Sequence, residues 1–361
     1  MDDVYLTTRE DPDNWEEEAN KRIEQLRKSN ADIKIVASSN HIKGQTSGYT
    51  LQVDQKTHNF AFGTALDCGH ISECLQSGVD DDYCQFASDH YNMLVCAYRM
   101  KIRYVEEVQG EYNYQSGDDM IEWTKLHNMR ARGHALLWAK ESNNPDWLKP
   151  MYGDEFVAAV YDRVDDATKR YSGYVEHWDV INEMVDQGGE SHRFYIEHSG
   201  DENIRPKIFQ RAKEISPETM FFLNDYGIVD DRYGRFNLFQ EQIRELLAGG
   251  APIDGIGLQV IQDYFAHYET FHLSFKTSCN IFTSFYKYMF QSHFTGYEID
   301  PYQIKDNVDK LSNEFGIPMW VTEFTWSRGD IDDPNHELHA KQLENYYRYR
   351  TKDTLFIEII I

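Results

Sequence analysis

The feature that most constrains the fold of this chain is its rhythm, in which short apolar runs alternate with amphipathic stretches of helical length. Such alternation is typical of parallel strands joined by crossover helices. Two of the helix candidates are 154–171 and 234–250, and the second closes on a Gly-Gly stop followed by Pro252. The expected strands are 60–66, 92–98, 132–138, 174–183, 219–226, 252–259, 318–324 and 355–361.

Eight strand-like runs with helices between them predict an α/β fold, a (β/α)8 TIM barrel, whose reactive groups belong at the carboxyl ends of the strands. The length of 361 residues suits one such barrel. We expect the barrel over 59–361, with an incomplete last strand at 355–361. Residues 1–58 lack the rhythm and predict a lead-in helix and a small β segment, which covers the barrel floor or ends an upstream domain.

One segment, 260–291, interrupts the pattern directly after a predicted strand. It holds 10 aromatic residues in 32 positions and neither Gly nor Pro, and it would add a connection unusually long for a compact barrel. We treat it as an atypical insertion.

Charge and composition narrow the classes of partner. The formal net charge of −25 disfavours nucleic acid and anionic membranes and leaves a neutral polymer such as a polysaccharide open. No apolar run is long enough to span a membrane, and the acidic N-terminus does not look like a secretion signal. The chain is therefore cytosolic or a fragment whose leader lies upstream.

The five cysteines show no metal-ligand spacing, so we expect no metal site and no zinc. Three of them lie within 17 residues, which is compatible with one disulfide. Buried free thiols explain the same residues equally well, so the cysteines leave the redox compartment open.

Two acidic residues, Glu183 and Glu323, end strand-like runs that a barrel would place as its fourth and seventh strands. Both would then face one cleft. Retaining hydrolysis of a glycosidic bond requires two carboxyl groups about 5–5.5 Å apart, one a proton donor and the other a nucleophile. Partial burial at a strand end can also raise the pKa of the donor. The pair predicts a retaining glycosidase.

The neighbours of these carboxylates fit a sugar site. Asn182 precedes Glu183 and can bind a hydroxyl beside the scissile bond, while His134 and Trp138 offer a polar anchor and an apolar platform. A third strand ends in Asn224, Asp225 and Tyr226. Burial of several polar side chains at one rim of the barrel costs free energy if they serve only as core residues. Their convergence therefore favours a binding role.

These motifs resemble glycoside hydrolase family 10, the endo-1,4-β-xylanases with a (β/α)8 barrel. The resemblance runs from about Arg22 to about Glu344 and rests on GHALLWAKESNNPDWL, VEHWDVINE, FFLNDYGIV, IDGIGLQ and MWVTEF. The lead-in is similar to that of animal and plant members, which often carry carbohydrate-binding modules upstream. The resemblance thus implies a secreted protein whose leader is not in this chain.

Carried over by motif, the resemblance implies that Glu183 is the general acid/base and Glu323 the nucleophile. It implies no metal or organic cofactor. The residues expected to bind substrate are Lys101, His134, Trp138, Asn182, Tyr226, Gln259 and His293.

The chain departs from the family pattern at four places. Gln259 is followed by Val260 and Ile261 in place of Ser and His, yet QSHF occurs at 291–294. We therefore interpret 260–291 as a translated retained intron or a genuine insertion, with His293 the displaced family histidine beside Glu323. The other departures are Ala97-Tyr98 in place of Glu-Asn, Thr325 in place of an acid, and a chain that stops before the usual eighth-strand segment.

The leading prediction is a retaining endo-β-1,4-glycanase that hydrolyses xylan-type polysaccharide by double displacement and works as a monomer. Two alternatives stay open. One is a catalytically impaired, carbohydrate-binding or structural barrel, and the other is a related retaining glycosidase with a different substrate. The residues at 97 and 98 support the last alternative, because subsite contacts set specificity.

Overall fold

The computed structural model describes Lys21, Glu24, Gln52 and residues 59–185, 192–231, 234–263, 301–327 and 359–360. All but three residues of the predicted lead-in of 1–58, most of the segment 260–291, and His293 lie outside these described residues. The division into a lead-in and a barrel therefore stays a prediction.

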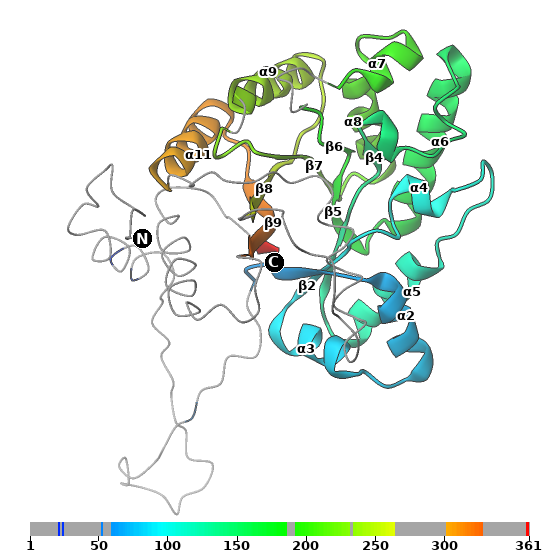
Figure 1. Ribbon diagram of the computed structural model, residues 1–361, viewed down its shortest axis with the longest axis vertical. Coiled ribbons are helices and arrows are strands. Elements are labelled where there is room, and N and C mark those ends of the chain that lie inside the picture. The colour runs from blue at the N-terminus through cyan, green and yellow to red at the C-terminus, as the bar shows by residue number, and fades with distance from the viewer. Residues whose placement is uncertain are drawn as a thin grey trace, which may run out of the picture.

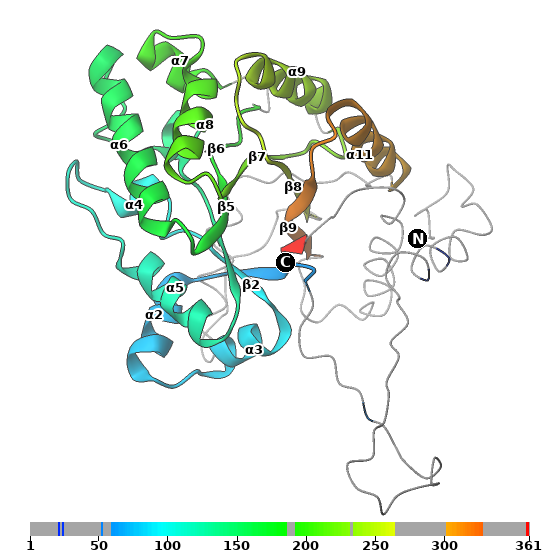
Figure 2. The ribbon, with the colours of Figure 1, turned by 180° about the vertical axis from the view of Figure 1, so that it is seen from behind.

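Eight parallel strands close into a barrel in the order β1-β10-β9-β8-β7-β5-β3-β2. This confirms the predicted (β/α)8 architecture. Helices lie outside the strands in both views: α8 contacts β7, α6 packs against α8, and α9 and α11 lie toward β7 to β9 (Figures 1 and 2). The barrel strands are β1 (Phe62–Leu66), β2 (Met93–Cys96), β3 (Arg130–Gly133), β5 (Val175–Asp179), β7 (Met220–Tyr226), β8 (Gly255–Asp263), β9 (Met319–Ser327) and β10 (Ile359–Ile360).

The helices occupy the stretches between strands, because their apolar residues recur on one face and pack against the barrel. The predicted helices at 154–171 and 234–250 are confirmed, and the second ends at Gly249 and Gly250, as its Gly-Gly stop indicates. The helices are α2 (Cys68–Ser77), α3 (Asp82–His90), α4 (Ile102–Val105), α5 (Gln115–Leu126), α6 (Gly153–Tyr171), α7 (Phe194–Ser199), α8 (Ile204–Ile215), α9 (Arg235–Ala248) and α11 (Pro301–Phe315), with a 3₁₀ turn η2 (Glu141–Asn143). No helix of the described part is long and apolar enough to cross a membrane.

Two of the predicted strands are wrong in their extent. The run 132–138 divides into β3 and β4 (Leu137–Trp138), and the run 174–183 divides into β5 and β6 (Ile181–Asn182). β4 and β6 pair with each other in a separate two-stranded sheet. The chain leaves the barrel wall at these points, so Trp138 and Asn182 stand side by side at the mouth.

Strand β8 is longer than the sequence predicts. It was expected to end at Gln259, but it continues to Asp263 and pairs with β9 as far as Ser327. The first four residues of the segment 260–291 therefore extend a barrel strand.

The inside of the barrel is filled with large side chains. Met93, Val95, Phe222 and Trp320 form a buried cluster, and the His177 ring packs edge-on 4.2 Å from the Trp320 ring. This filled interior keeps the strands rigid, so the side chains at their carboxyl ends hold fixed positions.

Candidate active site

Glu183 follows β6 directly and is held in an unusual backbone conformation. Its φ is 56°, a region that non-glycine residues seldom adopt. Its backbone N–H donates to the carbonyl of Asn224 in β7 at 3.0 Å, which anchors this turn to the barrel wall. Residues kept in such conformations cluster at functional sites, which supports the choice of Glu183.

Gln259 connects Glu183 with Glu323. It lies opposite Glu323 in the β8–β9 register, and its Nε2 donates to Glu183 Oε1 at 3.3 Å. Trp138 Nε1 donates to the other oxygen, Glu183 Oε2, at 3.2 Å. Gln259 thus bonds Glu183 and pairs in the sheet with Glu323, and the Glu183 carboxyl acts electrostatically on Glu323, although 140 positions separate the two glutamates in the sequence.

Burial raises the pKa of Glu183 and that of Glu323 above the ordinary value for a glutamate. The Glu183 carboxyl raises the pKa of Glu323 further, because two nearby negative charges disfavour each other. Lys101 acts in the opposite direction and lowers the pKa of both carboxyls. A buried acid pair beside one cation can keep one proton between its two members, as an acid and a nucleophile require.

Lys101 itself lies over Trp138, with its Nζ 4.4 Å from the ring centroid, and 5.3 Å from the centroid of the Tyr98 ring. Burial lowers the pKa of Lys101 to about 8. The lysine therefore still carries its charge near neutral pH, between two aromatic faces that favour a cation.

His134 is positioned by a buried carboxylate. Its Nδ1 lies 2.7 Å from Asp179 Oδ2, and Arg132 Nη2 donates to Asp179 Oδ1. The peptide bond between His134 and Ala135 is cis, and the His134 ring meets Trp138 edge-on at 5.5 Å. Burial and the nearby Lys101 charge lower the pKa of His134, so a neutral imidazole faces the site.

The side chain of Asn182 is fully buried, and only its amide oxygen has a hydrogen-bond partner among the described residues. Asn224 Nδ2 donates to its Oδ1 at 2.8 Å, and Thr322 Oγ1 in turn donates to Asn224 Oδ1. Asn182 Nδ2 has no partner in the part of the chain that the structure describes, and the same holds for Gln259 Oε1. Buried polar atoms are nearly always hydrogen-bonded, so these two beside Glu183 suit a ligand.

Tyr226 lies at the edge of the same group. Its ring faces the Arg235 guanidinium at 3.7 Å, and Arg235 Nη2 donates to Asp225 Oδ1 at 2.6 Å. Burial raises the pKa of Tyr226. The structure therefore brings six of the seven predicted substrate-binding residues to this end of the barrel, and the seventh, His293, lies outside the described residues.

Sequence reasoning missed three residues of the site. Asp179 lies inside the WDVINE motif and Arg132 directly precedes GHALLW, but neither ends a strand-like run. Tyr98 was noted only as a lost sugar contact. Its hydroxyl is buried with no partner among the described residues, and its pKa is raised to about 12, mainly by burial. The unpartnered hydroxyl is what marks Tyr98 as a site residue. The residue type alone does not show whether a hydroxyl has a partner, so the sequence could not reveal it.

The family model described as "Glycosyl hydrolase family 10" matches residues 51–281, which is well over half of the chain. The chain belongs to glycosyl hydrolase family 10. The resemblance to this family is thereby confirmed. Glu323 lies on the barrel strand β9, and Glu183 directly follows β6 of the two-stranded sheet.

Known relatives agree with this membership. The chain is 29% identical to the anti-sigma-I factor RsgI6 of Acetivibrio thermocellus over 92% of its length and 36% of that protein. It is 27% identical to endo-1,4-beta-xylanase 2 of Arabidopsis thaliana over 88% of its length and 25% of that protein. The chain thus spans only about a quarter to a third of these relatives.

Solved structures share the architecture. The intracellular xylanase TsXylA of Thermoanaerobacterium saccharolyticum superposes with a TM-score of 0.63 at 24% identity, covering 84% of this chain and 85% of that one. A xylanase 10B from Thermotoga maritima gives a TM-score of 0.61 at 20% identity, with 84% and 82% coverage. At these identities the likeness concerns the fold.

Proposed function

We propose that this family 10 barrel is a retaining endo-β-1,4-glycanase that acts on xylan-type polysaccharide. The observation that carries the proposal is the proximity of Glu183 and Glu323: Gln259 donates to one and pairs in the sheet with the other, and burial raises the pKa of both. Two carboxyl groups in such surroundings are the requirement of double displacement. The family and the printed names of the xylanase relatives support xylan as the substrate class.

In the proposed reaction Glu183 donates its proton to the oxygen of the leaving sugar. Glu323 attacks the anomeric carbon and forms a covalent glycosyl-enzyme intermediate. Glu183, now ionised, takes a proton from water, and that water releases the product with the original anomeric configuration. The hydrogen bonds from Trp138 and Gln259 fix the two oxygens of Glu183 for both steps.

The surrounding residues are proposed to hold the sugars. The free Nδ2 of Asn182 suits a hydroxyl of the reacting sugar, and the Trp138 ring suits its apolar face. Lys101 and the Tyr98 hydroxyl suit the next sugar along the chain, since Lys101 lies over the rings of both Trp138 and Tyr98.

The test is hydrolysis of xylan by the full chain. We expect new reducing ends, and proton spectroscopy of a short xylo-oligosaccharide should show the β-anomer first. Glu183→Gln and Glu323→Gln should each lower kcat by about 10²–10⁴-fold or more, since each removes an acid–base or covalent function.

The matched control is Glu176→Gln on strand β5, whose carboxylate is in a partly exposed ion pair with Arg130. It should leave kcat unchanged. Binding of xylan by the wild type without turnover, unaffected by Glu183→Gln, would instead support the impaired barrel. Turnover of another β-linked glycan with none of xylan would support the related glycosidase.

We propose further that the protein is a secreted monomer. The structure joins Cys68 to Cys96 and Cys74 to Cys84, and two disulfides suit an oxidising compartment. The sequence left one disulfide or buried free thiols open, whereas the structure has two disulfides, and Cys68–Cys96 reaches beyond the three closely spaced cysteines. Light scattering on the purified protein and mass spectrometry of its thiols test both parts.

A further inference from the structure

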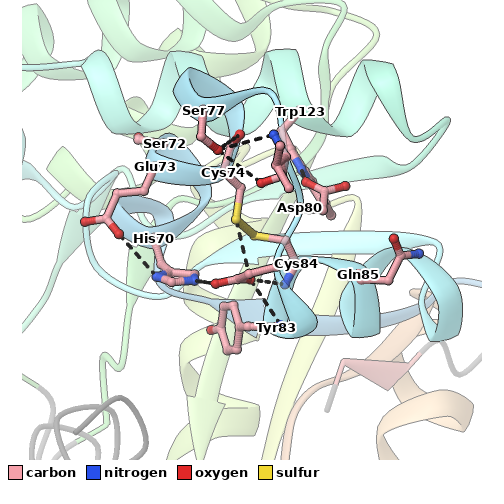
Figure 3. The surroundings of a disulfide bond; sticks show 12 residues. His70, Ser72, Glu73, Cys74, Ser77, Asp80, Tyr83, Cys84, Gln85 and Trp123 are labelled. Carbon is pink, nitrogen blue, oxygen red and sulfur yellow. Dashed lines mark hydrogen bonds and ion pairs between the residues drawn. A yellow bond between two sulfur atoms is a disulfide. The ribbon is translucent and has the colours of Figure 1, made fainter.

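Four side chains with metal-binding atoms meet between α2 and α3, outside the barrel strands. His70 and Cys74 come from α2, Asp81 caps α3, and Cys84 lies in its first turn. One ligand atom from each lies within 4.8 Å of the others. We call this group the α2–α3 cluster (Figure 3).

The imidazole of His70 in the α2–α3 cluster is oriented by carboxylates, as metal-binding histidines commonly are. His70 Nε2 lies 2.6 Å from Asp81 Oδ2, and its Nδ1 lies 3.5 Å from the carboxylate of Glu73 (Figure 3). The Tyr83 ring packs edge-on against the imidazole at 5.0 Å. Histidines that bind metals commonly give their second nitrogen to a carboxylate, which fixes the orientation of the ring.

The cysteines of the cluster are compatible with two chemical states. In the structure Cys74 and Cys84 form a disulfide, with their α-carbons 6.9 Å apart. Disulfides usually span about 4.4–6.8 Å between α-carbons, so this backbone spacing is at the wide limit. Two thiolates on one zinc ion would have their sulfurs about 3.8 Å apart, given Zn–S bonds of about 2.3 Å in a tetrahedron. A small rotation of the side chains separates the two states.

We propose that the α2–α3 cluster is a structural Zn²⁺ site in the reduced protein, and that zinc and the Cys74–Cys84 disulfide are alternative crosslinks. Two sulfurs, one imidazole nitrogen and one carboxylate oxygen form a four-ligand set that suits zinc. Both cysteines are buried, while His70 is partly and Asp81 largely exposed, so an ion can enter from solvent.

The exchange between the two states balances without a further reactant. A dithiol reductant transfers two electrons and two protons to the disulfide and becomes a cyclic disulfide itself, which leaves the thiols of Cys74 and Cys84. Zn²⁺ then binds and displaces both thiol protons. The same reductant can open the Cys68–Cys96 disulfide, whose sulfurs are not part of the cluster.

Either crosslink ties the same two helices. Asp81 Oδ1 accepts from the backbone N–H of Tyr83 and Cys84 at 3.1 and 3.0 Å and thereby starts α3. The Tyr83 hydroxyl accepts from the backbone of Asp67, which follows β1. With zinc, the protein keeps this tie in surroundings that reduce disulfides.

The spacing explains why the sequence predicts no zinc. The ligands follow the pattern His-x₃-Cys-x₆-Asp-x₂-Cys, with the cysteines ten residues apart and an aspartate between them. Common zinc motifs are recognised from close cysteine pairs, which this chain does not contain.

The experiment is a Co²⁺ titration of the full chain, reduced with a dithiol that is then removed under anaerobic conditions. We expect one Co²⁺ per chain, with thiolate charge-transfer and tetrahedral ligand-field bands, displaced by added Zn²⁺. The oxidised protein should show neither band. Cys74→Ser, Cys84→Ser and His70→Ala should each weaken binding by at least about 100-fold, since loss of even an outer-shell partner costs up to that much.

Two variants control for folding. Cys68→Ser breaks the other disulfide and should leave the Co²⁺ spectrum unchanged. Asp81→Asn retains a good helix cap for α3 but removes the carboxylate, so it should weaken Co²⁺ binding with little change in the Tm of the oxidised protein. An absent tetrahedral spectrum in folded reduced protein, or the same spectrum after Cys74→Ser and Cys84→Ser, would overturn the proposal. None of these readouts depends on the hydrolysis of xylan.

Discussion

Asp179 is the buried anion on which two side chains of the active site depend, and its replacement by Asn should destabilise the protein strongly. Asp179 and Arg132 have exposed side-chain fractions of 0% and 1%. One carboxylate oxygen accepts from Arg132 and the other lies 2.7 Å from His134 Nδ1. Asp179→Asn keeps the shape of the side chain, removes its charge and leaves the Arg132 guanidinium buried without an anion.

The magnitude follows from this burial. Removal of one partner from a buried ion pair lowers the free energy of unfolding by about 3–5 kcal/mol. The entropy of unfolding near the transition is about 2.1 cal/mol/K per residue, or about 0.76 kcal/mol/K for 361 residues. The Tm of Asp179→Asn should therefore fall by about 4–7 °C.

The assay is thermal unfolding by circular dichroism at neutral pH, with two comparisons. Glu176→Gln breaks a pair of exposed fractions 27% and 38% on the same strand, so it should cost at most about 1 kcal/mol and about 1.5 °C. The double variant Arg132→Met/Asp179→Asn removes the unpaired cation as well and should recover at least half of the lost Tm.

Two results would refute this reasoning. One is a Tm for Asp179→Asn equal to that of Glu176→Gln, because burial would then not determine how much stability is lost when an ion pair is broken. The other is a double variant that is less stable than the single one, because the buried charge would then not be the cause. We also expect a raised KM for Asp179→Asn, since His134 loses the group that orients it.

Three further predictions concern the active site. Lys101→Met removes a positive charge that lowers the pKa of both Glu183 and Glu323. Both limbs of the pH profile of kcat/KM should therefore move to higher pH, and a shift to lower pH would contradict this. Tyr98→Phe removes a buried, unmatched hydroxyl, so Tm should hold or rise while KM for xylo-oligosaccharides rises roughly 2- to 10-fold. Gly257→Ala would place a Cβ 2.2 Å from Asn224 Oδ1 and displace the amide that bonds Asn182. The free energy of unfolding should fall by about 1–3 kcal/mol, and kcat should fall as well. An unchanged kcat would exclude an effect of Asn224 on the site.

The parts of the fold that depend on local patterns could be predicted from the sequence. Strands such as 219–226 contain a continuous apolar run, here MFFL at 220–223, because parallel barrel strands are buried on both faces. The helix at 154–171 shows its apolar face by its period. Glu183 and Glu323 were identifiable because each ends such a run, and a barrel brings all strand ends to one rim.

The parts that depend on contacts between distant residues could not be predicted. The break between β3 and β4 exists because Leu137 pairs with Ile181 in a second sheet. The pattern of apolar residues within either segment does not reveal this pairing. The disulfide Cys68–Cys96 joins positions 28 residues apart, for which sequence spacing offers no rule. Arg132 resembles an ordinary strand residue until its partner Asp179 is known.

The unmatched polar atoms at the mouth of the barrel argue against an impaired, merely structural protein. Asn182 Nδ2, Gln259 Oε1 and the Tyr98 hydroxyl are all buried and have no partner within the described ranges. Each such atom costs about 1–3 kcal/mol, and apolar replacements of similar shape would remove that cost. Other unmatched atoms occur elsewhere in the molecule, but these three stand beside Glu183, Lys101 or Glu323. Stability alone would not favour their arrangement, whereas a role at a sugar site explains why polar groups are kept there.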